Sequence, residues 1–300
     1  MIEKLAIIGV GLIGGSVAMA LKEEGVVNEV VGCGRGKANL EKAQARGVID
    51  HFTHDVGEAV KGADMVLLAV PLGAMRDTLH AIRGELADNV VVTDAGSVKS
   101  SVVDDVKAVF QKMPDFFVPG HPIAGIERSG VEAAFAELYR NRRVILTPLP
   151  ETNADALNQV DKMWRQCGAE VTHMSVDHHD EVLAATSHLP HMLAFTLVDS
   201  LARMKENDKI FRFAAGGFRD FTRIASSNPV MWRDICVANQ KSLNGMLTRF
   251  ANKLHELAAL LQSGDEEGLL EVFERAKQAR DGYVDGVNGV VLITDKDVAP

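Results

Sequence analysis

A glycine-rich turn near the N-terminus constrains the fold of this chain more than any other feature. An apolar run over residues 4–8 leads into the motif Gly-Val-Gly-Leu-Ile-Gly at residues 9–14, and an apolar pattern with helical spacing follows at once. In a strand–turn–helix unit, such glycines allow a tight turn, a close approach of backbone to a pyrophosphate, and close packing of helix on strand. The helix N-terminus offers N–H groups and partial positive charge to phosphates. The alternative is a structural turn that binds nothing. We expect a dinucleotide site formed by Gly9, Gly11, Leu12, Ile13 and Gly14.

The sequence then alternates between strand and helix patterns as far as residue 174. Runs typical of buried strands occur at residues 29–33, 48–52, 63–71, 90–94, 143–148 and 169–174. This alternation predicts an α/β domain over residues 1–174, built on a doubly wound parallel sheet of the Rossmann type. Ligands of such sheets bind beyond the carboxyl ends of the strands. We therefore expect Val70 and Pro71 to contact the cofactor, and Pro71 and Ser97 to face its nicotinamide side.

The pattern changes at residue 175. From there to residue 280 we find apolar residues at helical spacing and no strand pattern, with Ser175 as an expected N-cap and a kink expected at Pro190. Long helical patterns follow at residues 230–261 and 266–279. This much apolar helical surface predicts an all-α substrate and dimerisation domain over residues 175–300, and hence a homodimer.

Composition excludes several functional classes. The 300 residues are 47% hydrophobic and carry a net charge of −9 with mixed signs, which argues against non-specific nucleic-acid binding. No apolar run reaches the roughly 20 residues of a membrane span, and the first residues lead directly into a strand pattern, so we expect a cytoplasmic protein without a signal peptide. The three cysteines, Cys33, Cys167 and Cys236, show no metal or redox spacing and are expected to be reduced and buried.

The end of the second predicted strand bears on cofactor choice. NAD-binding folds usually place an acidic residue there to bind the ribose 2′-hydroxyl. In this chain Gly34 and Arg35 follow the strand, and a guanidinium attracts a 2′-phosphate. The sequence therefore favours NADP through Arg35, with use of NAD as well as NADP as the alternative. A solvent-exposed Arg35, or one stacked on adenine, also remains open.

Two residues are candidates for proton transfer. His121 lies in a loop held by two prolines and two glycines, and a neutral imidazole can accept a proton near pH 7. The alternative for His121 is an ordinary core histidine. Ser97 follows the strand at residues 90–94 and could hydrogen-bond the same substrate hydroxyl, cap the next helix, or do both.

A second group of candidates lies in the helical region. His188 and His191 share a helix face and could line a cleft for an anionic substrate; no third metal ligand is apparent, so we expect no metal. His178 and His179 are expected to be solvated. The segment at residues 216–223 contains Gly217 and Arg223 and suggests a close turn that presents a guanidinium to a carboxylate; the alternative is a surface turn with ordinary ion pairs.

Four motifs occur together in one known family. They are Gly96-Ser97-Val98-Lys99, the segment from Gly120 to Gly125, Ser187-His188-Leu189-Pro190-His191, and the segment from Gly216 to Arg223. Over residues 4–280, the chain resembles the prephenate dehydrogenases, including the arogenate and cyclohexadienyl dehydrogenases. The resemblance implies oxidative decarboxylation of prephenate to 4-hydroxyphenylpyruvate, or of arogenate to tyrosine, with hydride transfer to NAD(P). It also implies a dimeric helical domain.

The resemblance also implies roles for individual residues. His121 would accept the ring hydroxyl proton, Ser97 would hydrogen-bond that hydroxyl or His121, and Arg223 would bind a substrate carboxylate. His188 and His191 would lie near the substrate side chain. Ile126 departs from the small hydroxyl residue that the family often has after Gly125, which puts polar recognition at this corner in question.

Two other functions fit parts of the sequence. A β-hydroxyacid-type dehydrogenase also joins a dinucleotide fold to helices, but it usually relies on a catalytic lysine rather than on a histidine-rich segment. A non-catalytic NADP-binding sensor or scaffold would not need His121, Ser97 and Arg223 together.

Overall fold

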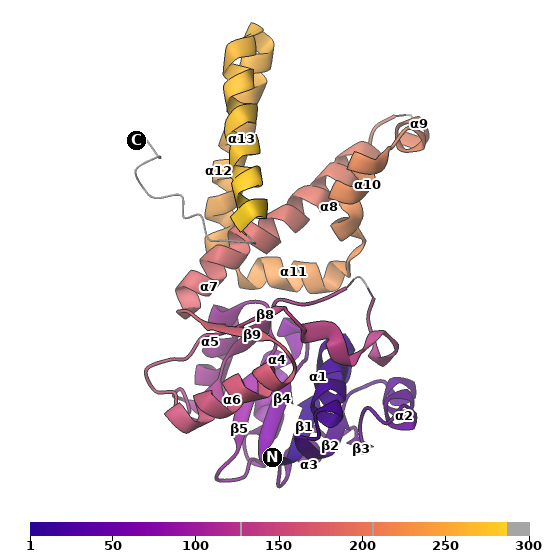
Figure 1. Cartoon of the computed structure of the whole chain (residues 1–300), viewed down its shortest axis with the longest axis vertical. Coiled ribbons are helices and arrows are strands. Elements are labelled where there is room, and N and C mark those ends of the chain that lie inside the picture. The colour runs from indigo at the N-terminus through magenta and orange to yellow at the C-terminus, as the bar shows by residue number, and fades with distance from the viewer. Residues whose placement is uncertain (127, 206, 287–300) are drawn as a thin grey trace. The chain divides into compact units, whose positions relative to one another are not determined.

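The computed structural model describes residues 1–126, 128–205 and 207–286. These form two compact units, residues 1–244 and a second unit that begins at Gly245. The first unit contains a six-stranded parallel sheet in the order β3–β2–β1–β4–β5–β6 (Figure 1). Its strands are β1 (Ile2–Ile8), β2 (Val27–Cys33), β3 (His51–Thr53), β4 (Met65–Leu68), β5 (Val91–Asp94) and β6 (Phe117–Val118). The doubly wound fold expected from the sequence is confirmed.

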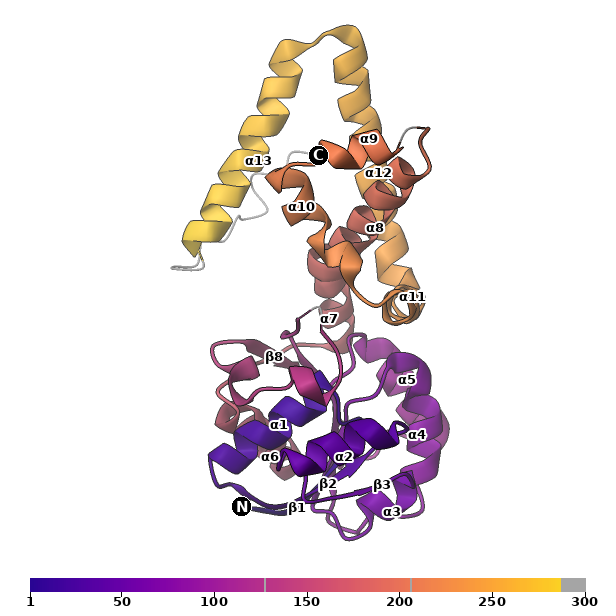
Figure 2. The same ribbon diagram turned by 90° about the vertical axis from the view of Figure 1, so that its right-hand side faces the viewer.

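Helices cover both faces of this sheet (Figures 1 and 2), and each face has its own apolar core. Alternate residues of β1 divide between them, since Leu5 and Ile7 join one core and Ala6 and Ile8 the other. One face is covered by α1 (Leu12–Glu23), α2 (Lys37–Ala45) and α6 (Ala154–Gln166). The other is covered by α3 (Val56–Val60), α4 (Met75–Ile82) and α5 (Lys99–Phe110).

The glycine-rich turn joins β1 to α1 at the centre of the sheet. Gly9 has a φ of +104°, and a Cβ there would lie 2.3 Å from the carbonyl oxygen of Ala69. A Cβ on Gly14 would lie 2.4 Å from the oxygen of Gly9, so helix and turn are in direct backbone contact. In contrast, a Cβ on Gly11 would meet no described atom within 4 Å. Open space therefore remains beside the N-terminus of α1.

A second, smaller sheet places His121. It is three-stranded, in the order β7–β8–β9, with strands β7 (Gly120–Pro122), β8 (Arg143–Leu146) and β9 (Glu170–His173). β7 runs antiparallel to β8, whereas β8 and β9 are parallel. The backbone N–H of Gly120 donates to Asp94 at the end of β5, at 3.1 Å. His121 is thereby fixed next to the carboxyl end of β5, and ligands of parallel sheets bind beyond the carboxyl ends of the strands.

Between Ser175 and residue 244 the described chain is helical. Ser175 caps α7 (Val176–Leu183), as expected from the sequence. A π-helical turn, η4 (Ala184–His188), precedes α8 (Leu189–Ala202), so the helical hydrogen bonding is irregular just before Pro190, while the kink expected there stays a prediction. Farther along lie α9 (Asn207–Arg212), α10 (Gly216–Thr222), η5 (Arg223–Ser226) and α11 (Pro229–Ala238). The close turn expected at residues 216–223 is wrong, because this segment is helical. The boundary at residues 174 and 175 stays a prediction.

The second unit consists of most of α12 (Gln240–Ser263) and of α13 (Glu266–Gly286), joined by a turn at Gly264 with a φ of +68°. The long pattern at residues 230–261 is thus two helices, α11 and α12, separated at Asn239. Over the described residues, no helix combines the length and hydropathy that a membrane crossing requires.

Candidate active site

Three histidines from different elements meet beside the end of β5. His121 comes from β7, His179 from α7 and His188 from the π-helical turn η4. All three side chains are buried, with His179 fully inaccessible to solvent. The Nδ1 atom of His121 lies 2.9 Å from Nε2 of His179, and their rings meet edge to face. The sequence-predicted proton acceptor therefore has a direct imidazole partner.

Asp180 anchors this pair of histidines. Its carboxylate oxygen Oδ1 lies 2.7 Å from Nδ1 of His179. The same carboxylate accepts hydrogen bonds from the backbone N–H groups of Lys99 at 2.8 Å and Ser100 at 2.9 Å. Those two groups begin α5, where backbone N–H groups lack intrahelical partners and favour a negative charge. The first turn of α5 thus holds Asp180, and Asp180 holds His179.

A buried ion pair lies behind the same residues. Lys99 and Asp94 are both completely buried, and the ammonium group of Lys99 donates to Asp94 and, at 2.6 Å, to the carbonyl oxygen of Gly120. Asp94 also accepts from the backbone N–H groups of Gly96 and Gly120. The pair therefore joins the end of β5, the start of α5 and the start of β7, which carries His121.

Asn239 links His188 to the anchor. Its side-chain amide nitrogen donates to the backbone oxygen of Asp180 at 2.8 Å and lies 3.0 Å from Nδ1 of His188. His191, the first-turn residue of α8, has Nδ1 2.8 Å from the carbonyl oxygen of Ser187. Its ring stacks on Trp232 of α11, with centroids 3.6 Å apart. The structure thus brings His121, His188 and His191 into one histidine cluster, together with His179.

Burial sets the charge of this cluster. It lowers the pKa of His121 well below the ordinary value, and the neighbouring His179, Lys99 and His188 lower it further. Burial likewise lowers the pKa of His188 to about 4, and it lowers the pKa values of His179 and His191. For Asp180, burial raises the carboxyl pKa, but hydrogen bonds from His179 and Ser100 outweigh it and leave the pKa below its usual value. At neutral pH the histidines are therefore neutral and Asp180 is charged.

The other sequence-predicted residues lie around this cluster at different depths. Val70 and Pro71 follow β4 and Ala69, and the backbone of Ala69 lies against Gly9. Ser97 is half-buried between β5 and α5, and within the described ranges no hydrogen bond joins its hydroxyl to His121. Gly217 and Arg223 are exposed on α10 and η5, and η5 packs against α8, the helix that carries His191.

Sequence reasoning missed four residues of this arrangement. The expectation that His178 and His179 are solvated is right for His178 and wrong for His179, which is buried. The four-residue spacing of His179 and Leu183 places both on one face of α7 and could have signalled this. The roles of Asp180 and Asn239 depend on contacts between residues 50 or more positions apart, which no local pattern encodes. Lys99 contacts Asp94, five positions away, and Gly120, 21 positions away, and the sequence does not show that these three residues meet.

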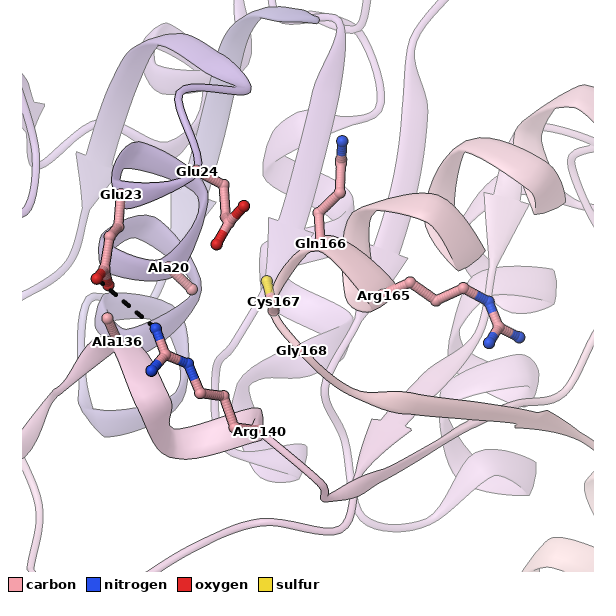
Figure 3. A pocket seen from close by; sticks show the side chains of 9 residues that line it. All are labelled: Ala20, Glu23, Glu24, Ala136, Arg140, Arg165, Gln166, Cys167 and Gly168. Atoms are coloured by element: carbon pink, nitrogen blue, oxygen red, sulfur yellow. Dashed lines mark ion pairs between the residues drawn. The ribbon is translucent and has the colours of Figure 1, made fainter.

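Two cavities lie away from the histidine cluster. One, of about 180 Å³, is lined by the C-terminal ends of α1 and α6. Figure 3 shows Arg140 pointing across it toward Glu23, with which it forms an ion pair at 3.6 Å, while Arg165 points away. Burial raises the pKa of Cys167 in its wall to about 12, so this thiol stays protonated. The other cavity, of about 240 Å³, lies against the loop that follows His121. Among the described residues, no group of three His, Cys, Asp or Glu side chains is placed to bind a metal ion.

Comparisons with known proteins agree with this architecture. Residues 17–173 match the family model of the prephenate dehydrogenase nucleotide-binding domain, and residues 175–275 match that of the prephenate dehydrogenase dimerization domain. The chain is 38% identical to the cyclohexadienyl dehydrogenase of Zymomonas mobilis, with 99% of each chain covered.

Solved structures give the same result. A crystal structure of prephenate dehydrogenase from A. aeolicus, in complex with hydroxyphenyl propionate and NAD+, has a TM-score of 0.87 and 36% identity, over 93% of this chain and 98% of that one. Synechocystis arogenate dehydrogenase has a TM-score of 0.78 and 27% identity, over 93% of this chain and 99% of that one. The chain belongs to the prephenate dehydrogenase family, whose members are oxidoreductases.

Proposed function

We propose that this protein oxidatively decarboxylates prephenate, arogenate or both, with NAD(P) as hydride acceptor. The observation that carries the proposal is the position of His121, a buried neutral imidazole beside the carboxyl end of β5. Relatives named cyclohexadienyl dehydrogenase, prephenate dehydrogenase and arogenate dehydrogenase support it. Neither the β-hydroxyacid-type dehydrogenase nor the non-catalytic sensor gains support from these observations.

In this proposal His121 acts as the general base. It accepts the proton of the ring hydroxyl while the hydrogen on the same carbon leaves as hydride. It returns that proton to the oxygen when carbon dioxide departs and the ring becomes aromatic. Ser97 is proposed to hydrogen-bond the hydroxyl, and Arg223 to bind a substrate carboxylate. We assign His188 and His191 to the substrate side chain, and Gly217 to the same substrate-binding segment as Arg223.

The residues of the glycine-rich turn fit a dinucleotide. The open space beside Gly11 lies at the N-terminus of a 12-residue helix, and no side chain in the described part of the protein caps that end. First-turn N–H groups without a partner form an anion site. We propose that the pyrophosphate lies there, held by Gly9, Gly11, Leu12, Ile13 and Gly14, with Val70 and Pro71 nearer the nicotinamide. When bound, the nicotinamide supplies the hydride acceptor.

We further propose that NADP is preferred over NAD. Arg35 is exposed two residues after the end of β2, and it forms no ion pair within the described part of the chain. Asp55 opposes this preference, because its charge is close enough to raise the pKa of Cys33 at the end of the same strand. The ratio of kcat/KM for NADP and NAD tests the balance. A ratio that favours NADP and falls about tenfold in Arg35→Ala supports the proposal; a ratio that favours NAD in the unmodified protein contradicts it.

The general base can be tested directly. We expect His121→Asn to lower kcat by about 10²–10⁴-fold in a 340 nm assay with prephenate or arogenate, because general-base catalysis contributes about that factor. Cofactor affinity should stay within twofold of the unmodified protein. His80→Asn, on the surface of α4, is a matched control that should leave kcat unchanged. Near-normal turnover by His121→Asn would exclude this role.

A further inference from the structure

The hydrogen bonds around His121 determine which of its two nitrogens carries the proton. We propose that His179 and Asp180 are positioning residues that hold His121 with Nδ1 protonated and Nε2 free to act as the base. This inference rests on the proposed function for its catalytic meaning. The tautomer itself follows from the geometry of the cluster.

Asp180 is the fixed end of the chain of hydrogen bonds. Its carboxylate already accepts two backbone N–H groups from the start of α5, and these can only donate. A carboxylate in that position is an acceptor. Because Oδ1 lies 2.7 Å from Nδ1 of His179, the proton of His179 must lie on Nδ1.

The orientation then passes to His121. A neutral imidazole with its proton on Nδ1 has an acceptor at Nε2. Nε2 of His179 lies 2.9 Å from Nδ1 of His121, so Nδ1 of His121 must donate, and its Nε2 keeps the lone pair. His179 stays neutral because it is fully buried and the charged Lys99 lies nearby, although Asp180 and Asp94 act in the opposite direction.

The same bonds also favour the state that follows proton transfer. Once Nε2 of His121 has accepted a proton, the positive ring still donates from Nδ1 to His179, whose dipole is oriented by the Asp180 carboxylate. Hydrogen bonds to an ionised group are stronger than neutral ones. The pair therefore stabilises the protonated base relative to the neutral one, without touching the substrate.

A pair of substitutions at His179 separates orientation from packing. A glutamine can donate to Asp180 through its amide nitrogen and accept from His121 through its amide oxygen, whereas leucine can do neither. We expect His179→Leu to lower kcat about 10²-fold or more, with substrate KM and cofactor Kd within twofold, and His179→Gln to recover at least tenfold of that loss. His178→Leu, the exposed neighbour on the same helix, is the control that should keep full kcat.

The tautomer can be read without any turnover. In the full-length protein labelled with ¹⁵N-histidine, the His121 signals, identified by their loss in His121→Asn, should show an unprotonated Nε2 and a protonated Nδ1 at pH 7. In His179→Leu, we expect a mixture of both tautomers. A protonated Nε2 in the unmodified protein, or full kcat in His179→Leu, would overturn the inference. An unmodified protein with the expected tautomer but no turnover of prephenate or arogenate would instead refute the proposed function.

Discussion

At the scale of single residues, the main feature of this protein is a set of histidines that stay neutral because they are buried. His188 is the clearest case, since its side chain is almost inaccessible and its pKa is lowered from 6.5 to about 4. The groups that face it are Asp180, which raises the pKa, and His179 and His191, which lower it. Between pH 6.5 and about pH 4, His188 therefore binds a proton more readily in the unfolded chain than in the folded one.

This difference predicts how stability depends on pH. Because the pKa of His188 is lower in the folded protein, its contribution to the free energy of unfolding is fully present above pH 6.5. That contribution is lost as the pH falls toward 4, and the loss amounts to up to about 3 kcal/mol. His188→Asn keeps an acceptor for Asn239 but cannot titrate. We expect the free energy of unfolding of the unmodified protein to fall more steeply than that of His188→Asn between pH 6.5 and 4, as measured by urea denaturation. Parallel curves would contradict this account.

At the scale of elements, the Lys99–Asp94 pair holds together three segments that meet near His121. Both side chains are wholly buried, so removing one leaves the other charge without compensation. We expect Lys99→Met to lower the free energy of unfolding by about 3–5 kcal/mol. Lys107→Met, at an exposed position of the same helix, should change it by less than about 0.5 kcal/mol.

A double variant distinguishes loss of charge balance from loss of packing. Lys99→Met combined with Asp94→Asn leaves no buried charge, and we expect it to recover part of the lost stability in the same denaturation experiment. A double variant as unstable as the sum of both single variants would show that the ion pair contributes through shape alone.

The elements also show what the sequence could and could not predict. Local patterns located most of the strands and the glycine-rich turn, because continuous apolar runs and tight turns depend on neighbouring residues. His121, expected in a rigid loop, instead lies on the short strand β7, because its backbone pairs with the distant strand β8. The split between α11 and α12 was not predicted, because Asn239 ends α11 while its side chain bonds to α7 and His188, more than 50 residues away. His179 was missed although its helical spacing with Leu183 could have signalled its burial, whereas the contact of Lys99 with Gly120 depends on how α5 and β7 meet.

At the scale of the whole molecule, the second unit has apolar surface that it does not bury. Among residues 245–282, no side chain is buried. Yet α12 repeats apolar residues at alternating spacings of three and four, the pattern of a helix that packs along a seam. This seam consists of Leu247, Phe250, Leu254, Leu257 and Leu261. Leu254 is 50% exposed and Leu261 is 65% exposed, as is typical of a surface that pairs with another chain.

We propose that a second copy of the chain covers this seam, which agrees with the match of residues 175–275 to a dimerization domain. Two chains of 32.4 kDa should sediment as one species of about 65 kDa at micromolar concentration. Leu254→Asp with Leu261→Asp places two charges in the seam, and burying an unpaired carboxylate is strongly unfavourable. We therefore expect this variant to sediment as a monomer, while Asn252→Asp, on the opposite face of α12, should remain dimeric. If the seam variant kept the mass of a dimer, the contact between subunits would have to lie elsewhere on the helices that follow Ser175.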